Sequence, residues 1–83
     1  MEVLFTQHAK SRMKLRGIKR EWVLSGLKHP VHITRHPNDS ELMIYYSWVT
    51  ARSRWLKMII KVSGSRLTVV TTHFDHTYKG IVP

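Results

Sequence analysis

Residues 6–18 have the sequence TQHAKSRMKLRGI, and this stretch predicts the first element of the fold. Thr6 is a good N-cap because its hydroxyl can accept a hydrogen bond from a free backbone N–H in the first turn. Gly17 can take the left-handed backbone that ends many helices, and Ile18 is the apolar residue that usually follows. We therefore expect a helix over residues 7–16.

A second helix is expected immediately afterwards, from residue 19 or 20 to residue 27. Trp22, Val23 and Leu27 are spaced for burial on one side of this helix. Pro30 prevents its continuation, because proline lacks the N–H that the next turn needs. The chain therefore begins with two short helices joined by a tight connection.

After Pro30 the apolar pattern changes to alternation, which is typical of strands. The expected strands are residues 31–35, 42–50, 55–62 and 66–72. Residues 3–5 are expected only as an extended lead-in, and no element is assigned after residue 72. Short connections between strands predict an antiparallel meander, and the helices must cover one face because a lone small sheet buries too little surface. The expected fold is α+β, with two N-terminal helices packed on a three- to four-stranded antiparallel sheet, as one domain over residues 1–83.

Charge gives the strongest indication of a partner. Fourteen Lys and Arg residues face five Asp and Glu residues, for a formal net charge of +9. Self-repulsion of this size disfavours the compact state unless a polyanion neutralises it. Nucleic acid, an acidic protein and an anionic membrane surface are the candidates, and RNA is preferred. The alternative is a basic surface that serves only solubility.

The composition excludes several classes of protein. The chain has no cysteine, so neither a disulfide framework nor a cysteine zinc site is expected. The five carboxylates are spread along the chain, whereas a two-metal nuclease needs a cluster of them, and there is no glycine-rich phosphate loop. No metal and no cofactor are therefore expected.

Residues 1–5 carry no basic leader, and the longest apolar-rich stretch, Leu42 to Ala51, is far below the ~18 residues of a membrane span. We therefore expect a cytoplasmic protein that has no membrane partner.

His8, Arg12 and Arg16 are spaced four residues apart on the first helix, so they fall within about 80° of one another around its axis. Ala9 and Met13 lie beside them at the margin of the same side. Basic residues that border a buried face need an explanation, because unpaired burial of charge is costly. Either they form a site, or the histidine caps the helix or hydrogen-bonds locally and the arginines extend their charged ends to solvent or pair with Glu21 or Glu41.

A second group of reactive side chains follows the last strand. His73 and His76 have the chemistry of a general base and a general acid, and Tyr78 or Lys79 can contact phosphate. A metal site of His73, Asp75 and His76 is a weaker hypothesis, because this spacing is common by chance. The structural alternative is a mobile, solvated tail.

A run of cations is interleaved with tryptophans in the second half of the chain. Cations with exposed aromatic side chains suit single-stranded nucleic acid, because charge binds phosphate and ring faces stack on bases. Trp55 shares a strand face with Lys57 and Lys61 and is expected to be at least partly exposed, whereas Trp48 is expected in the core. The alternative is an ordinary solvated face. The expected nucleic-acid-binding residues are Arg52, Arg54, Trp55, Lys57, Lys61 and Lys79.

Residues 6–18 also resemble the T-x-H-A-x-x-R-M-x-x-R-G-I signature of a small bacterial family of unknown function, related to the BrnT and RelE type toxins of toxin–antitoxin systems. The resemblance continues through the second helix and two strands, to about Thr72. It implies a fold similar to that of RelE-like ribonucleases and the activity of a ribonuclease-type toxin. It also implies that His8, Arg12 and Arg16 are motif residues and that Lys57 occupies a basic position.

The leading hypothesis is therefore a metal-free endoribonuclease of toxin type. The 2′-hydroxyl of the RNA supplies the nucleophile, so the protein needs only a base, a proton donor and cations. The catalytic residues expected are His8, Arg12, Arg16 and His73. A non-catalytic nucleic-acid-binding module is the first alternative. The second is an interaction domain whose basic surface docks on an acidic antitoxin or similar partner.

Overall fold

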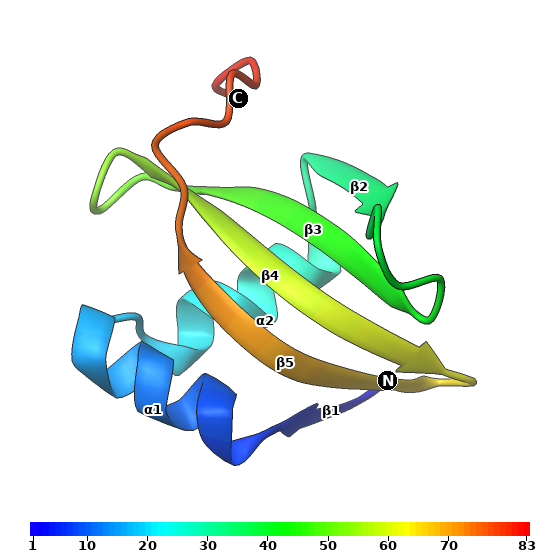
Figure 1. The fold of residues 1–83 in the computed structure, drawn as a ribbon. Helices are drawn as coiled ribbons and strands as arrows, with labels where there is room; N and C mark the ends of the chain where they lie inside the picture. Colours follow the sequence, from blue (N-terminus) through cyan, green and yellow to red (C-terminus); the bar gives the residue numbers. More distant parts are fainter.

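The computed structural model describes all 83 residues and has two helices and one sheet. Its elements are β1 (Glu2–Phe5), α1 (Gln7–Arg16), α2 (Arg20–Lys28), β2 (His32–Arg35), β3 (Leu42–Val49), β4 (Arg54–Ser63) and β5 (Arg66–Phe74). The strand order is β1-β5-β4-β3-β2, shown in Figure 1. The expected α+β class, the two helices and the four later strands are confirmed. Neither helix is long and apolar enough to cross a membrane.

The sheet differs from the expected meander at one edge. It has five strands and is mixed, because β1 pairs in parallel with β5, with Glu2 opposite Arg66 and Phe5 opposite Val69. The Glu2 carboxylate also accepts a hydrogen bond from Arg66 Nε at 2.9 Å. Residues 3–5 are extended as expected, but their pairing into the sheet was not predicted, since four residues are too short to show a period and their partners lie 64 positions away.

The ends of α1 follow the local chemistry that the sequence predicts. Thr6 Oγ1 accepts a hydrogen bond from the Ala9 backbone N–H at 3.0 Å. Gly17 adopts a left-handed φ of 65°, and its backbone N–H donates to the Met13 carbonyl. Ile18 is buried directly after this turn. These contacts fix both ends of α1 and direct the chain into α2.

The core lies between the helices and one face of the sheet. α2 lies behind β3 and β4 in Figure 1. The core is a single cluster of twelve buried residues: Ala9, Met13, Ile18, Val23, Leu27, Val49, Leu56, Met58, Ile60, Leu67, Val69 and Phe74. We call the opposite side of the sheet, turned away from α2, the open face.

A β-bulge in β5 decides which residues reach the open face. Ile60 pairs with Val69 and Ile59 pairs with Thr71, so Val70 is an extra residue in the strand. An extra residue inverts the alternation of the side chains that follow it. Thr72 is therefore fully buried and its Oγ1 donates to the Lys57 carbonyl at 2.9 Å. Its neighbour His73 points to the open face, where an unbroken alternation would have placed it in the core.

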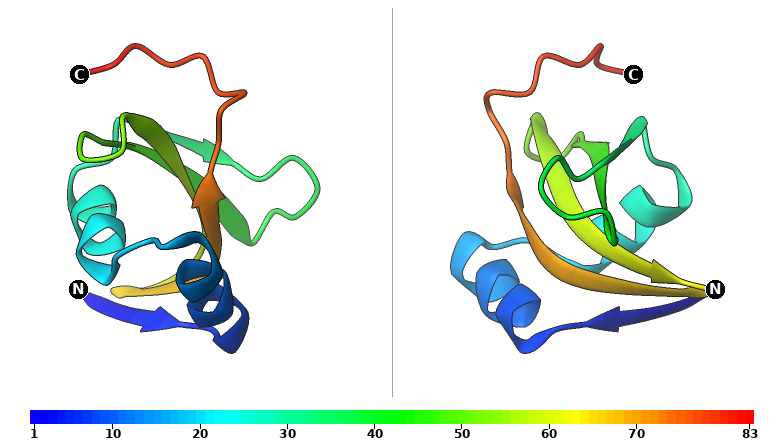
Figure 2. Two further views of the ribbon diagram at one scale, coloured as in Figure 1. Left: turned by 90° about the vertical axis from the view of Figure 1, so that its left-hand side faces the viewer. Right: turned by 45° about the vertical axis from the view of Figure 1, so that its right-hand side comes forward.

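α1 continues the edge of the sheet where β1 ends. The Thr6 N–H donates to the Val69 carbonyl at 3.1 Å, and Thr6 Oγ1 donates to the Val70 carbonyl at 2.8 Å. The chain then turns into α1, which lies beside β5 (Figure 2). Because Ala9 and Met13 of α1 enter the core, the adjacent side of the helix faces the open side of the sheet edge.

Candidate functional site

One cleft joins α1 to β5, and all four residues expected to be catalytic line it. His8, Arg12 and Arg16 come from α1, and Thr71 and His73 come from β5. The cleft has a volume of about 370 Å³ and no apolar residue in its lining. We call it the His–Arg cleft. Helical periodicity predicts that the three α1 residues share a side, whereas the bulge in β5 is what brings His73 to them.

The cations of the cleft have no carboxylate partner. Arg12 is half-buried and Arg16 is exposed, and neither makes a salt bridge or a side-chain hydrogen bond. The two salt bridges of the protein join other residues: Lys61 to Glu41 at 3.7 Å, and Arg66 to Glu2 at 2.9 Å. The pairing of these arginines with Glu21 or Glu41, which the sequence allowed, is therefore absent. The guanidinium groups are free to bind an anion.

Lys57 adds a third cation beside the cleft. It pairs directly with His73 across β4 and β5, so both side chains stand next to each other on the open face. Lys57 makes no salt bridge. A phosphate group at His73 would therefore meet positive charge from both the helix and the neighbouring strand.

The environment of His73 favours its neutral form. Burial lowers the pKa of His73 below the ordinary value of 6.5, and the charge of Lys57 lowers it further. Asp75 opposes this effect in part, and Arg16 and Arg12 add to the lowering. A neutral imidazole at pH 7 can accept a proton, so His73 has the protonation state that a general base requires.

The segment after β5 does not form the metal site considered from the sequence. His73 faces the cleft, whereas His76 is exposed and lines a separate pocket together with Trp55. Nowhere in the chain do three or more His, Asp or Glu residues come together in a group that could hold a metal ion. Asp75 is instead engaged by Thr77, whose N–H and Oγ1 donate to its Oδ1 at 2.9 and 2.7 Å. Burial acts to raise the pKa of Asp75, but these bonds and Lys57 hold it below its ordinary value.

The tail, which is the segment after β5, is not solvated throughout. Its contacts reduce the solvent exposure of Trp55. The Tyr78 ring lies 3.9 Å from the Tyr46 ring and 4.9 Å from the Trp55 ring, measured between centroids. Trp55 is consequently only 7% exposed, so the expectation that it is open to solvent was wrong. Trp48, expected in the core, is half-buried on the open face, edge-on to Trp55.

The other cations expected to bind nucleic acid lie in three separate places. Arg52 and Arg54 lie over the Phe74 ring at 5.2 and 5.9 Å. Arg52 also reaches Gly17, at the end of α1 that carries Arg16. Lys79 is exposed on the tail.

Lys61 lies apart from these cations. It is four residues along β4 from Lys57, about 13 Å away at the rise of a strand, and it is paired with Glu41. The cations next to the His–Arg cleft are therefore Lys57 and, at the end of α1, Arg52.

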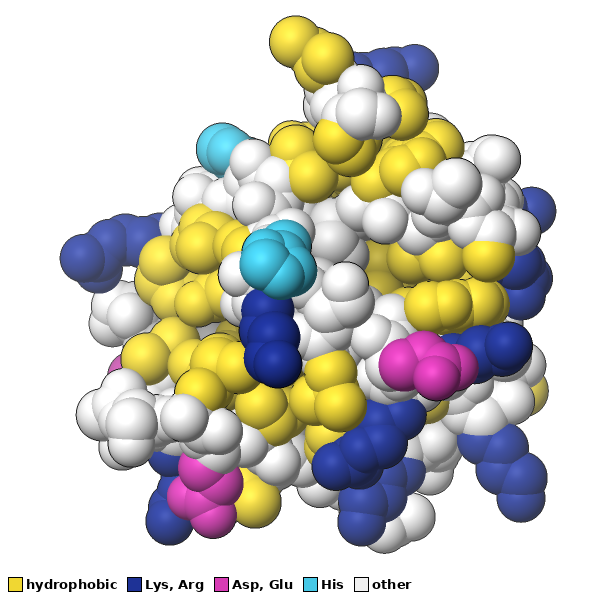
Figure 3. Space-filling model, turned by 180° about the vertical axis from the view of Figure 1, so that it is seen from behind, with side chains coloured by type: hydrophobic (Ala, Val, Ile, Leu, Met, Phe, Trp, Pro, Cys, Tyr) yellow, Lys and Arg dark blue, Asp and Glu magenta, His cyan; other side chains and the backbone are white.

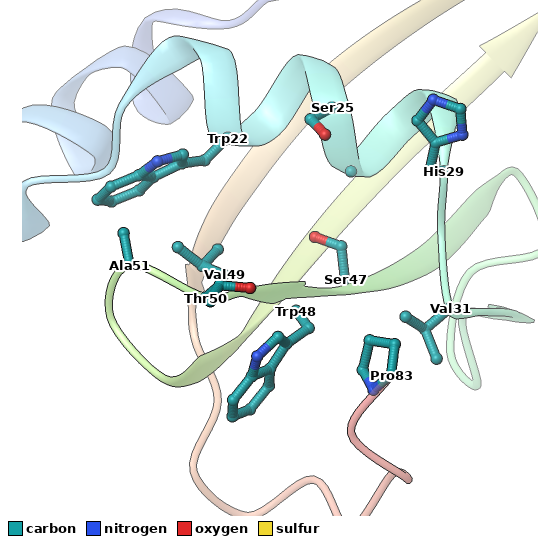
Figure 4. Close-up of a pocket in the computed structure, with 11 residues that line it drawn as sticks. Trp22, Ser25, His29, Val31, Ser47, Trp48, Val49, Thr50, Ala51 and Pro83 are labelled. Atoms are coloured by element: carbon teal, nitrogen blue, oxygen red, sulfur yellow. The ribbon is translucent and has the colours of Figure 1, made fainter.

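The largest cavity of the molecule has a different character. It has a volume of about 490 Å³ and lies between α2 and β3, with Trp22, Trp48 and Pro83 in its lining (Figure 4). No Lys, Arg, Asp or Glu lines it, and His29 is its one histidine. The rear of the molecule shows apolar side chains in several patches, with Lys and Arg side chains around its margin and also near its middle, beside a histidine (Figure 3). The basic side chains therefore gather at the smaller cleft on the edge of the sheet and not at this cavity.

The fold and the cleft define an α+β domain whose N-terminal helix carries a His–Arg stripe along the edge of a mixed sheet. The chain belongs to the family described as Domain of unknown function (DUF4258), which matches residues 5–74. The match includes every residue of the His–Arg cleft, while the tail after residue 74 lies outside it. Comparison with curated proteins and comparison with solved structures gave no match.

Proposed function

We propose that this protein is a metal-independent endoribonuclease of toxin type that cleaves single-stranded RNA at the His–Arg cleft. One observation carries the proposal: a histidine with a lowered pKa stands among Arg12, Arg16 and Lys57, and none of these cations is neutralised by a carboxylate. Unpaired cations around a neutral imidazole suit a reaction in which a phosphodiester gains negative charge in the transition state.

The reaction needs no nucleophile from the protein. His73, as general base, removes the proton of the RNA 2′-hydroxyl, and that oxygen forms a bond to the adjacent phosphorus. The bond from phosphorus to the 5′-oxygen then breaks, and His8, as general acid, donates a proton to the leaving oxygen. Arg12, Arg16 and Lys57 stabilise the pentacovalent phosphorane. The products are a 2′,3′-cyclic phosphate and a 5′-hydroxyl end.

The toxin assignment rests on the resemblance of residues 6–18 to the signature of the toxin-related family and on the net charge of +9. A cytoplasmic RNase of this kind needs an inhibitor in the cell that produces it. An acidic antitoxin protein that covers the His–Arg cleft is the partner that the exposed cations would attract.

Cleavage of labelled single-stranded RNA in EDTA tests the proposal. General acid–base catalysis contributes roughly 10²- to 10⁴-fold, so His73→Ala and His8→Ala should each lower the cleavage rate by about that factor. His29→Ala is the matched control, because His29 is an exposed histidine that lines the largest cavity and not the His–Arg cleft. Equal rates for wild type and His73→Ala would reject the assignment of the site.

A non-catalytic RNA-binding module is the competing function, favoured by the free cations alone. It predicts RNA binding that weakens steeply with salt, without any cleaved product. Arg12→Ala would then weaken binding, whereas Arg35→Ala, at an exposed arginine without a salt bridge on β2, would change it little.

A further inference from the structure

A row of four side chains crosses the open face next to the His–Arg cleft. His32 pairs with Tyr46, Tyr46 pairs with Lys57, and Lys57 pairs with His73, on β2, β3, β4 and β5 in turn. Directly paired residues lie on the same side of a sheet, and neighbouring strands are about 4.8 Å apart. Tyr46 therefore lies about 10 Å from His73, with the Lys57 cation between them.

The Tyr46 ring is covered by a ring from the tail. Tyr78 lies parallel to it, with a centroid separation of 3.9 Å and an interplanar angle of 9°. Trp55 meets Tyr78 edge-on at 82°, and His32 lies 6.3 Å from it. A planar ring held face to face on tyrosine and bounded by other aromatic side chains is the geometry in which proteins hold an unstacked nucleobase.

Few polar contacts hold Tyr78 in this place. The segment after β5 makes one backbone hydrogen bond to the sheet, from the Asp75 N–H to the Trp55 carbonyl at 2.9 Å. The bonds between Asp75 and Thr77 lie within the segment itself. Tyr78 thus stays on the sheet mainly through ring contacts, which a base of similar shape can replace.

We propose that Tyr46, bounded by Trp55 and His32, is a nucleobase-stacking subsite, which Tyr78 occupies in the free protein and leaves when RNA binds. The inference rests on the proposed function, because the RNA phosphate is placed at Lys57 and the His–Arg cleft. An RNA strand that crosses β5, β4 and β3 then lays a base on Tyr46 while its adjacent phosphate lies beside Lys57. The ligand class is single-stranded RNA, and stacking on a tyrosine accepts any base.

Fluorescence anisotropy with a short, labelled 2′-O-methyl RNA tests the subsite separately from cleavage, because this probe lacks the nucleophile. Tyr46→Ala should weaken binding about 10-fold or more, as loss of a stacked base does. Tyr46→Phe should bind like the wild type, and Tyr78→Ala should bind more tightly because no ring has to leave. Tyr46→Leu, which keeps the apolar cover of the strand, should also weaken binding about 10-fold or more, and it tests the subsite if the alanine variant folds poorly.

An abasic version of the probe supplies the second control. It should bind wild type and Tyr46→Leu equally, because it has no base to stack. Tyr78→Ala binding that is equal to or weaker than wild type overturns the displacement of Tyr78, and equal binding by wild type and Tyr46→Leu overturns the subsite. If those results come with intact RNA cleavage, only the inference fails. If the wild type neither binds nor cleaves RNA, the proposed function fails with it.

Discussion

Thr6 links the helix, the bulge and the candidate site, so its hydroxyl offers a quantitative test of the fold. Thr6→Val keeps the shape of the side chain and removes two hydrogen bonds, from Ala9 N–H at 3.0 Å and to the Val70 carbonyl at 2.8 Å. Loss of an N-cap costs about 1 kcal/mol. Loss of a partly buried hydrogen bond that leaves a carbonyl unpaired costs about another 1 kcal/mol. The expected decrease in the free energy of unfolding is therefore about 2 kcal/mol.

Urea unfolding followed by tryptophan fluorescence measures this decrease. Thr6→Ser keeps the hydroxyl and should retain most of the stability. Thr34→Val is the matched control, since Thr34 is an exposed strand residue without a side-chain hydrogen bond and should change stability by less than about 0.5 kcal/mol. A Thr6→Val variant as stable as Thr34→Val would refute the role given to the hydroxyl.

Two further predictions concern the packing of α2 and the pH dependence of the site. Gly26→Ala should lower the free energy of unfolding by about 1–3 kcal/mol, because a Cβ at this position would collide with Ser47 Oγ; an unchanged thermal midpoint would contradict this. Lys57→Gln should raise the pKa of His73 toward 6.5, because a nearby positive charge is removed. Protonation stops His73 from acting as a base, so the acidic fall in cleavage rate lies below pH 6.5 in the wild type and moves upward in Lys57→Gln. NMR titration of the imidazole checks the shift, with Lys61→Gln as a control that should leave it unchanged.

Local signals predicted the helical part of the fold almost to the residue. The expected helix at residues 7–16 is α1, because its cap at Thr6 and its left-handed end at Gly17 are chemical features of single residues. The expected helix from residue 19 or 20 to residue 27 differs from α2 by one residue at its end. β1 was missed, since its four residues are paired with a strand at the other end of the chain.

The candidate site was also predictable only where local signals determine it. Helical spacing placed three of its residues on one side of α1, whereas the position of His73 depends on the bulge at Val70. The sequence Val69-Val70-Thr71-Thr72 carries a trace of that bulge, because its apolar and polar residues do not alternate. The stack of Tyr78 on Tyr46 has no such local signal, since it depends on where an irregular tail returns to the sheet.

The chemical identity of the RNA ends tests the central claim most directly. A short single-stranded RNA is incubated with the protein in EDTA, and the products are analysed by mass spectrometry, beside a copy that carries 2′-O-methyl at the cleaved position. If the 2′-hydroxyl attacks with His73 as general base, the products carry a 2′,3′-cyclic phosphate and a 5′-hydroxyl, and the methylated copy is not cleaved. Cleavage that continues in the methylated copy, or that requires a divalent metal, would contradict the account.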